Sequence, residues 1–248
     1  MGRNKNHISK NGYDLAWLAL ATGLLPFVVV HIAFIASAIQ GYIPSCNPYL
    51  DGCASISASG RHGFSYIFFK MGMIPAALLL AAFWVICRLW LLQLGDKNIL
   101  VLWLVAICGV VSAVFLVLYT VYLGSEGDFY PFMRRIGVIV YFAFSYLAQL
   151  LLLARLQRLQ MQKLSALPRF VLTGKTMLVG GLMIFGLASI PVRNFVDDQL
   201  VDKDRVENII EWWFSLMMVG YYFLTWFAWR VCNIRLHMTP LRVAEGRR

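Results

Sequence analysis

The sequence predicts an all-α membrane protein, a bundle of six transmembrane helices in one domain over residues 1–248, with both termini in the cytoplasm. Of its 248 residues, 60% are hydrophobic and 14% are charged, whereas soluble domains average about 45–50% and about 25%. Such a chain is too apolar for a soluble monomer, and too rich in aliphatic and aromatic residues for intrinsic disorder. The spacing of the apolar stretches and the placement of the basic residues supply the rest of the prediction.

Six apolar stretches are long enough to cross a hydrocarbon core about 30 Å thick, which takes about 20 residues per helix. They cover residues 15–40, 64–92, 99–123, 132–154, 172–192 and 209–231. The first stretch exceeds the 7–15 residues of a signal-peptide core, so we expect a permanent span. The stretches are also too long and too uniformly apolar for the alternating strands of an outer-membrane barrel.

The basic residues predict the orientation of the bundle. Fifteen of the 22 lysines and arginines fall on the face that holds the termini and seven on the other, while the acids divide three to nine. The terminal face therefore carries +12 and the opposite face −2. Because cytoplasmic loops are enriched in lysine and arginine, we expect both termini in the cytoplasm. This dispersed charge favours contact with anionic phospholipids and argues against nucleic-acid binding.

The first non-cytoplasmic loop, residues 41–63, holds two of the five cysteines. Cys46 and Cys53 lie seven residues apart in a compartment that permits disulfides. We expect a disulfide that staples the loop, with two free thiols as the alternative. His62 is the only further soft ligand nearby, so no metal or other cofactor is expected.

Three ionisable residues within the predicted spans stand out, all in the outer half of the bilayer. They are His31, Lys70 and Glu211. An ionisable group in hydrocarbon is costly, so each is a functional candidate. The chain has no Walker loop, HExxH, GxSxG or CxxC motif, which leaves these residues as the main evidence for chemistry.

These residues, with polar residues of the outer loops, predict an outward-facing polar cavity roofed by the first loop. The loop candidates are Asp51, Arg61, His62, Arg134 and Arg135. Cations there would hold a phospholipid headgroup, and an acid or histidine could move protons. Tyr141, Ser145 and Gln149, spaced four residues apart, should share a helix face that looks into the bundle.

Each candidate also has a structural interpretation. Lys70 can extend to the membrane interface, Glu211 can be an ion-pair partner, and His31 can be a neutral packing residue. Arg134 and Arg135 can be neutralised by Glu126 and Asp128.

Two stretches of the chain resemble the DRAM/Frag/Sfk family of six-span membrane proteins. One runs from Cys46-Asn47-Pro48-Tyr49 to the serine-alanine-glycine run at residues 55–60, followed by Tyr66 and Lys70. The other is Glu211-Trp212 with the Tyr-Phe-Leu-Thr segment at residues 222–225. The early part of the fourth span departs from the family pattern, since Arg134-Arg135 stand where histidine or asparagine is common.

The resemblance implies work on lipids, because the family includes autophagy modulators and proteins that remodel the lipid of GPI anchors. We expect an accessory or regulatory protein that binds membrane phospholipids through the outer cavity, with a lipid-modifying membrane enzyme as a further partner. One alternative is a lipid-remodelling enzyme with His62 or His31 as base and Asp51 or Glu211 beside it. Another is a small-solute or proton-coupled transporter. The small size favours a bacterial inner membrane over a eukaryotic endomembrane.

Overall fold

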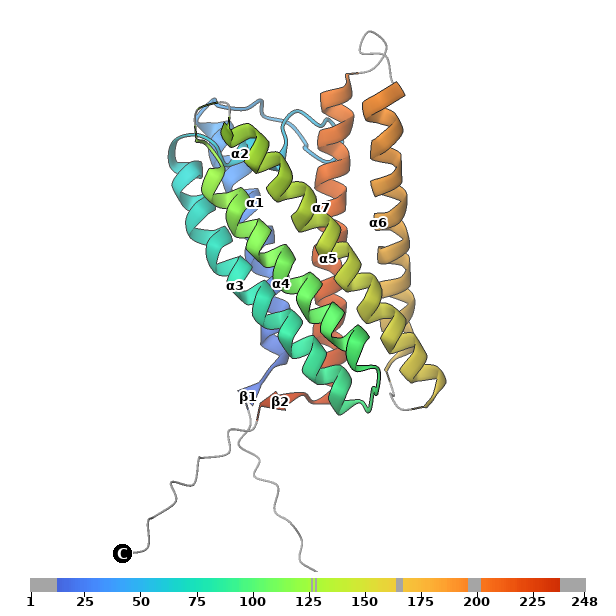
Figure 1. Cartoon of the computed structure of the whole chain (residues 1–248). Coiled ribbons are helices and arrows are strands. Elements are labelled where there is room, and N and C mark those ends of the chain that lie inside the picture. Colours follow the sequence, from blue (N-terminus) through green and yellow to red (C-terminus); the bar gives the residue numbers. More distant parts are fainter. Residues whose placement is uncertain (1–12, 126, 128, 164–166, 196–201, 237–248) are drawn as a thin grey trace, which may run out of the picture.

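The computed structural model describes residues 13–125, 127, 129–163, 167–195 and 202–236 (Figure 1). This part of the chain forms seven α-helices and two short strands. In chain order they are β1 (Tyr13–Asp14), α1 (Ala16–Ile39), α2 (Ile56–Ser59), α3 (Gly63–Gln93), α4 (Ile99–Tyr122), α5 (Phe129–Met161), α6 (Arg169–Phe195), α7 (Lys203–Cys232) and β2 (Arg235–Leu236). The all-helical prediction is confirmed, and each predicted span lies on one of the six long helices.

Five of the helices, α1, α3, α4, α5 and α6, are long and apolar enough to cross a membrane. Helix α7 is 30 residues long, but it is not one of these five when the described residues are considered. Its apolar part is built largely from tryptophan and tyrosine, which score low in hydropathy although they favour membrane interfaces. The sixth crossing therefore stays a prediction.

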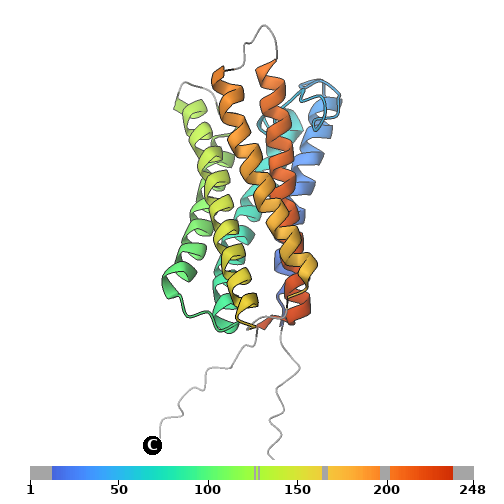
Figure 2. The ribbon, with the colours of Figure 1, turned by 90° about the vertical axis from the view of Figure 1, so that its right-hand side faces the viewer.

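The six long helices pack as an open ring (Figures 1 and 2). Helix α1 packs on α3 and α7, α4 lies between α3 and α5, and α6 packs on α7. Helices α5 and α6 complete the ring, and they approach each other towards the end of the bundle that holds β1 and β2. We call this end the terminal end and the opposite one the loop end.

An aromatic cluster fills the middle of the bundle on the side of the terminal end. The ring of Phe83 lies 5.0–5.3 Å from those of Trp84, Tyr222 and Trp229, and Trp90 meets Trp229 at 6.0 Å. All five side chains are buried. Helix α4 passes this cluster at Gly109, where a Cβ atom would overlap the ring of Trp84. A residue without a side chain is therefore required for α3 and α4 to approach this closely.

The terminal end is closed by two pairings. Strands β1 and β2 pair antiparallel, and the Leu15 amide donates to the carbonyl of Ile234. Between α3 and α4, Asp96 accepts two hydrogen bonds from the Arg155 guanidinium, one of them at 2.7 Å from Nε to Oδ2. Burial alone would raise the pKa of Asp96, but the bonds from Arg155 and from the Asn98 amide outweigh it and lower this pKa.

Candidate functional site

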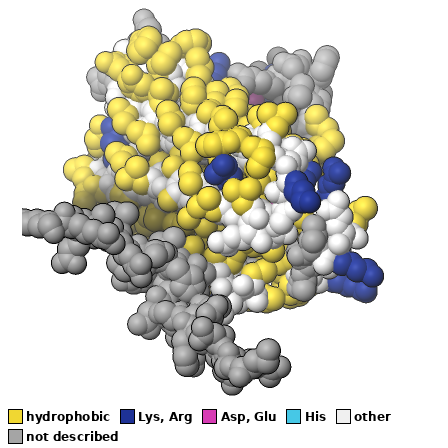
Figure 3. Space-filling model, turned by 60° about the horizontal axis from the view of Figure 1, so that its bottom comes forward, with side chains coloured by type: hydrophobic (Ala, Val, Ile, Leu, Met, Phe, Trp, Pro, Cys, Tyr) yellow, Lys and Arg dark blue, Asp and Glu magenta, His cyan; other side chains and the backbone are white. Residues whose placement is uncertain are grey.

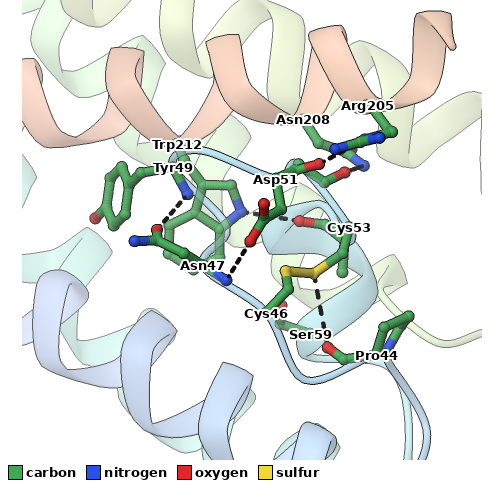
Figure 4. The surroundings of a disulfide bond; sticks show 12 residues. Pro44, Cys46, Asn47, Tyr49, Asp51, Cys53, Ser59, Arg205, Asn208 and Trp212 are labelled. Carbon is green, nitrogen blue, oxygen red and sulfur yellow. Dashed lines mark hydrogen bonds between the residues drawn. A yellow bond between two sulfur atoms is a disulfide. The ribbon is translucent and has the colours of Figure 1, made fainter.

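The first loop at the loop end has a fixed conformation. Cys46 and Cys53 form a disulfide, as the sequence predicts (Figure 4). Inside the loop that it closes, Asp51 accepts a hydrogen bond from the Asn47 amide at 2.9 Å. The short helix α2 follows and is capped by Ser55, whose hydroxyl accepts from the Ala58 amide at 3.0 Å. Some of the polar groups of the loop are therefore satisfied within the loop itself.

The outer part of α7 holds this loop in place by a row of side-chain donors (Figure 4). Arg205 donates to the carbonyl of Asp51 at 2.8 Å, and Asn208 donates to that of Gly52 at 2.8 Å. One helical turn further on, the indole of Trp212 donates to the carbonyl of Ala54 at 2.9 Å. Trp213 adds a bond to the carbonyl of Tyr49 at 3.1 Å. The loop is thus bound to α7 through its backbone.

Under this loop lies a cavity of about 840 Å³, which we call the outer cavity. Its walls come from the end of the first loop and from α4, α5, α6 and α7. The polar lining gathers towards the loop end: Ser55, Ser57, Arg61, Tyr119, Arg134, Arg135, Glu207, Asn208 and Glu211. The apolar lining comes from α5, α6 and α7: Pro131, Phe132, Val138, Ile139, Phe142, Ala143, Gly186, Ile210 and Phe214. The cavity is thus amphipathic.

The outer cavity is not fully enclosed. Two of its apolar lining residues, Phe132 and Ile139 of α5, are 58% and 53% exposed. A bond between α5 and α6, from Gln157 to Thr176 at 3.0 Å, lies near the terminal end, and the two helices separate towards the loop end (Figure 1). The outer cavity therefore lies where α5 and α6 are apart, and both helices contribute to its lining.

The structure brings four of the predicted site residues together in this cavity: Arg61, Arg134, Arg135 and Glu211. The Arg61 guanidinium donates to the Ser57 hydroxyl at 3.2 Å, while its buried Nε has no protein partner within the described residues. Arg61 and Glu211 are close enough to interact electrostatically, and so are Arg61 and Arg134. Glu126 and Asp128, considered as neutralising partners for the arginines, lie outside the described residues.

The other predicted site residues lie elsewhere. Lys70 sits over the ring of Tyr66 and donates to its hydroxyl at 2.6 Å and to the carbonyl of Val121 at 3.0 Å. The exposed His62 precedes α3 and stacks on Tyr42 at 5.2 Å. Asp51 belongs to the loop itself, as described above. None of the three lines the outer cavity in the described part of the chain.

His31 is held between helix and loop. Its Nδ1 pairs with the carbonyl of Phe27 at 2.7 Å and its Nε2 with the hydroxyl of Tyr49 at 2.9 Å. The ring also meets the edge of Trp212 at 5.4 Å. Because Nδ1 faces a carbonyl it must donate, so a neutral His31 accepts from Tyr49 through Nε2. This arrangement suits the packing role considered for His31.

Sequence reasoning missed one ionisable residue of the bundle. Lys175 of α6 is completely buried, and its ammonium donates to the Thr225 hydroxyl at 2.6 Å and lies 3.3 Å from the centroid of the Tyr221 ring. From the sequence, Lys175 is expected among the fifteen basic residues of the terminal face. Its position inside the predicted span 172–192 was the available signal, because a lysine there requires a partner.

Comparison with known protein families gives one match that covers most of the chain. The family described as Frag1/DRAM/Sfk1/Cwh43P N-terminal domain matches residues 14–230. Among curated proteins and solved structures, no relative matches significantly. The match runs from β1 to the last turn of α7, and so includes the first loop, the outer cavity and all six long helices. The chain is therefore an integral multi-pass membrane protein that belongs to the Frag1/DRAM/Sfk1/Cwh43 family.

Proposed function

We propose that this protein binds a phospholipid in the outer cavity and serves as an accessory or regulatory protein in membrane lipid handling. One observation carries the proposal: three guanidinium groups and a set of apolar side chains line one cavity, and two of the apolar ones, Phe132 and Ile139, are more than half exposed. This polarity matches a phospholipid, whose headgroup is charged and whose acyl chains are apolar. The chains can remain in the bilayer between α5 and α6 while the headgroup enters.

The three arginines are suited to a phosphate group. A guanidinium presents donors in a planar fork that matches phosphate oxygens, and it stays charged at all physiological pH values. Arg61, Arg134 and Arg135 come from two separate segments and face the same space. Glu207 and Glu211 offset part of this charge, so the cavity as a whole keeps a modest positive charge that favours an anionic group.

Binding accounts for the arrangement better than histidine-based catalysis does. A general base must lie within about 2.6–3.2 Å of the proton that it takes, directly or through one water. His62 and His31 both have other partners and lie outside the cavity lining. The remodelling-enzyme alternative would therefore need a different base.

We also propose six crossings with a cytoplasmic terminal end. Because β1 and β2 pair at one end, the chain enters and leaves the bundle on the same side, which requires an even number of crossings. Helix α7 then supplies the sixth. The terminal end carries most of the described cations, some of which appear in Figure 3, as cytoplasmic ends usually do. They are Arg88, Lys97, Arg155, Arg158, Lys163, Arg169, Arg230 and Arg235, with the buried Lys175 deeper in the bundle.

Native mass spectrometry of the protein in mild detergent tests the lipid proposal. The parent should retain a phospholipid, and Arg134→Ala should weaken its binding about tenfold to a hundredfold, the equivalent of one charge-assisted hydrogen bond. Lys70→Ala is the matched control, because it removes a cation at the same end of the bundle but outside the cavity.

Two outcomes would contradict the proposal. One is a parent protein that retains no phospholipid when delipidated protein is mixed with phosphatidylglycerol or phosphatidylethanolamine. The other is equal loss of lipid from Lys70→Ala and Arg134→Ala, which would assign the effect to general surface charge. Thermal unfolding in the same detergent shows whether each variant remains folded.

A further inference from the structure

A row of polar side chains runs along the facing sides of α5 and α7, deep to the outer cavity. On α7 it consists of Glu211, Ser215, Tyr222 and Thr225, and on α5 of Tyr141, Ser145 and Gln149. The spacings of three, four and seven residues keep each set on one helix face. Ser145, Gln149 and Thr225 are fully buried, and Tyr222 is 3% exposed. We call these seven residues the polar seam.

Four polar atoms of the seam have no protein partner among the described residues. They are Ser145 Oγ, both amide atoms of Gln149 and the hydroxyl of Tyr222. Tyr222 lies close enough to Ser145 and Gln149 for the three to interact. A buried polar group left unpaired costs about 1–3 kcal/mol, so a cluster of them in a membrane protein needs a compensating ligand. Water is the smallest molecule that can accept from the amide nitrogen of Gln149, donate to its amide oxygen, and do either with the two hydroxyls.

There is space for water beside this cluster. A chamber of about 40 Å³ lies between α1, α3, α4, α5 and α7; its lining is mostly apolar, and Tyr141, Glu211, Ser215 and Tyr222 are among its polar members. A water molecule needs about 10–15 Å³ of such volume and two to four polar partners. The chamber therefore has room for a small number of waters, and its four polar residues of the seam supply their partners on the side of α5 and α7.

Glu211 forms the outer end of the seam. It lines the chamber and the outer cavity alike, so it stands between the two spaces. The charged and titratable groups that face it are Arg61 from the first loop, Arg134 and Tyr141 from α5, Tyr119 from α4, and Glu207 and Tyr222 from α7. A carboxylate here can exchange a proton with either space.

Lys175 forms the other end. Its ammonium donates to the Thr225 hydroxyl and lies against the face of the Tyr221 ring. The hydroxyl of Tyr221 donates in turn to the carbonyl of Gln149 at 2.8 Å. Within the described part of the chain, no carboxylate pairs with Lys175. Thr225 follows Glu211 by 14 residues on α7, which at 1.5 Å per residue is about 21 Å of a hydrocarbon core about 30 Å thick.

We propose that the polar seam binds a chain of water molecules and relays protons between Glu211 and Lys175. The Lys175 ammonium first releases a proton towards the terminal end and becomes a neutral amine. The Glu211 carboxyl then releases a proton to a water in the chamber. Waters and the Tyr222 and Ser145 hydroxyls each accept one proton and pass one on, the Lys175 amine takes up the last, and Glu211 takes one up from the outer cavity. No electrons move, and charge is balanced by one proton entering for each that leaves.

The test is proton flux into liposomes that contain the whole protein. The vesicles enclose a pH-sensitive dye and carry a potassium diffusion potential, and protein-free vesicles give the background. The parent should take up protons faster than the background. Tyr222→Phe removes one hydroxyl of the relay and should lower the protein-dependent flux about tenfold, equivalent to a barrier about 1.4 kcal/mol higher. Glu211→Gln should abolish it.

Ser37→Ala is the matched control. It also removes a buried hydroxyl without a protein partner among the described residues, but on α1 and outside the seam, so it should leave the flux unchanged. If Tyr222→Phe unfolds in thermal assays, Ser145→Ala replaces it as the milder change. A parent flux equal to background overturns the relay, and so does an unchanged flux in a folded Tyr222→Phe or Ser145→Ala protein.

Discussion

Single residues at the terminal end determine how the bundle responds to acid. Asp96 is 4% exposed and bound to Arg155, which lowers its pKa below the usual value. A carboxyl of this kind stabilises the fold fully above its unfolded pKa of about 3.9, and the contribution is lost as the pH falls through the lower folded pKa. We expect Asp96→Asn to cost about 3 kcal/mol at pH 7, because it leaves the Arg155 charge without its partner.

Unfolding in detergent at pH 7 and at pH 3 measures this effect. The difference between parent and Asp96→Asn should shrink at pH 3, where the parent carboxyl begins to take up its proton. Asp14→Asn is the control, since Asp14 is an exposed acid at the same end whose bond to the Ala16 amide an asparagine can replace. Equal destabilisation by both variants would contradict a specific role for the buried pair.

For single residues, the sequence predicts which ionisable side chains are costly to bury, but rarely which residues pair with them. Asp96 and Arg155 are separated by 59 positions, and they meet only because the α3–α4 turn reaches α5. Lys70 and Lys175 illustrate the same limit. Both are lysines inside predicted spans, yet one bonds a neighbouring tyrosine at the loop end and the other is buried under Tyr221. The direction of a side chain depends on helix rotation, which hydropathy does not give.

The first loop behaves as an element that depends on α7. Gly52 has a φ of +61° and lies against α7, so a Cβ atom there would overlap the carbonyl oxygen of Arg205. We expect Gly52→Ala to detach the loop from α7 and to expose it to protease. Gly41→Ala is the matched control, because Gly41 has a similar φ of +75° but no atom within 4 Å of an added Cβ. Only Gly52→Ala should speed cleavage within residues 41–63 in limited proteolysis.

The disulfide contributes to the same element in a different way. It closes a short loop, and loss of such a bond typically costs about 2–4 kcal/mol, chiefly because the unfolded chain gains freedom. We therefore expect the Cys46→Ser/Cys53→Ser double variant to unfold at lower temperature than the parent in detergent. An unchanged unfolding temperature would mean that the bonds from Arg205, Asn208 and Trp212 suffice to hold the loop.

Helix positions follow from the sequence better than helix ends do. The first three predicted spans differ from α1, α3 and α4 by a single residue at most at each end. Helix α5 runs on to Met161 and α7 begins at Lys203, beyond the predicted 154 and before the predicted 209. Hydropathy locates the part of a helix that lies in hydrocarbon, whereas caps such as Asp202 decide where the helix begins.

The outer cavity could be predicted as a place but only partly as a set of residues. Arg61, Arg134, Arg135 and Glu211 lie in it, whereas His31, His62, Lys70 and Asp51 do not. Depth in the membrane follows from the position of a residue along its span. Membership of one cavity depends on the order of helices around the ring, with α5 facing α7 across a gap towards the loop end, and no pattern in the sequence encodes that order.

For the whole molecule, the pairing of β1 with β2 makes the orientation testable from one end. A single added cysteine at Gly127, between α4 and α5, should react with a membrane-impermeant maleimide in intact cells. One at Lys97, between α3 and α4, should react only after the membrane is opened. The parent protein is the control for background labelling, since its three free cysteines are buried or half-buried. The proposed cytoplasmic terminal end predicts this result. Labelling of Lys97→Cys in intact cells would mean that the bundle has the opposite orientation, with the outer cavity facing the cytoplasm.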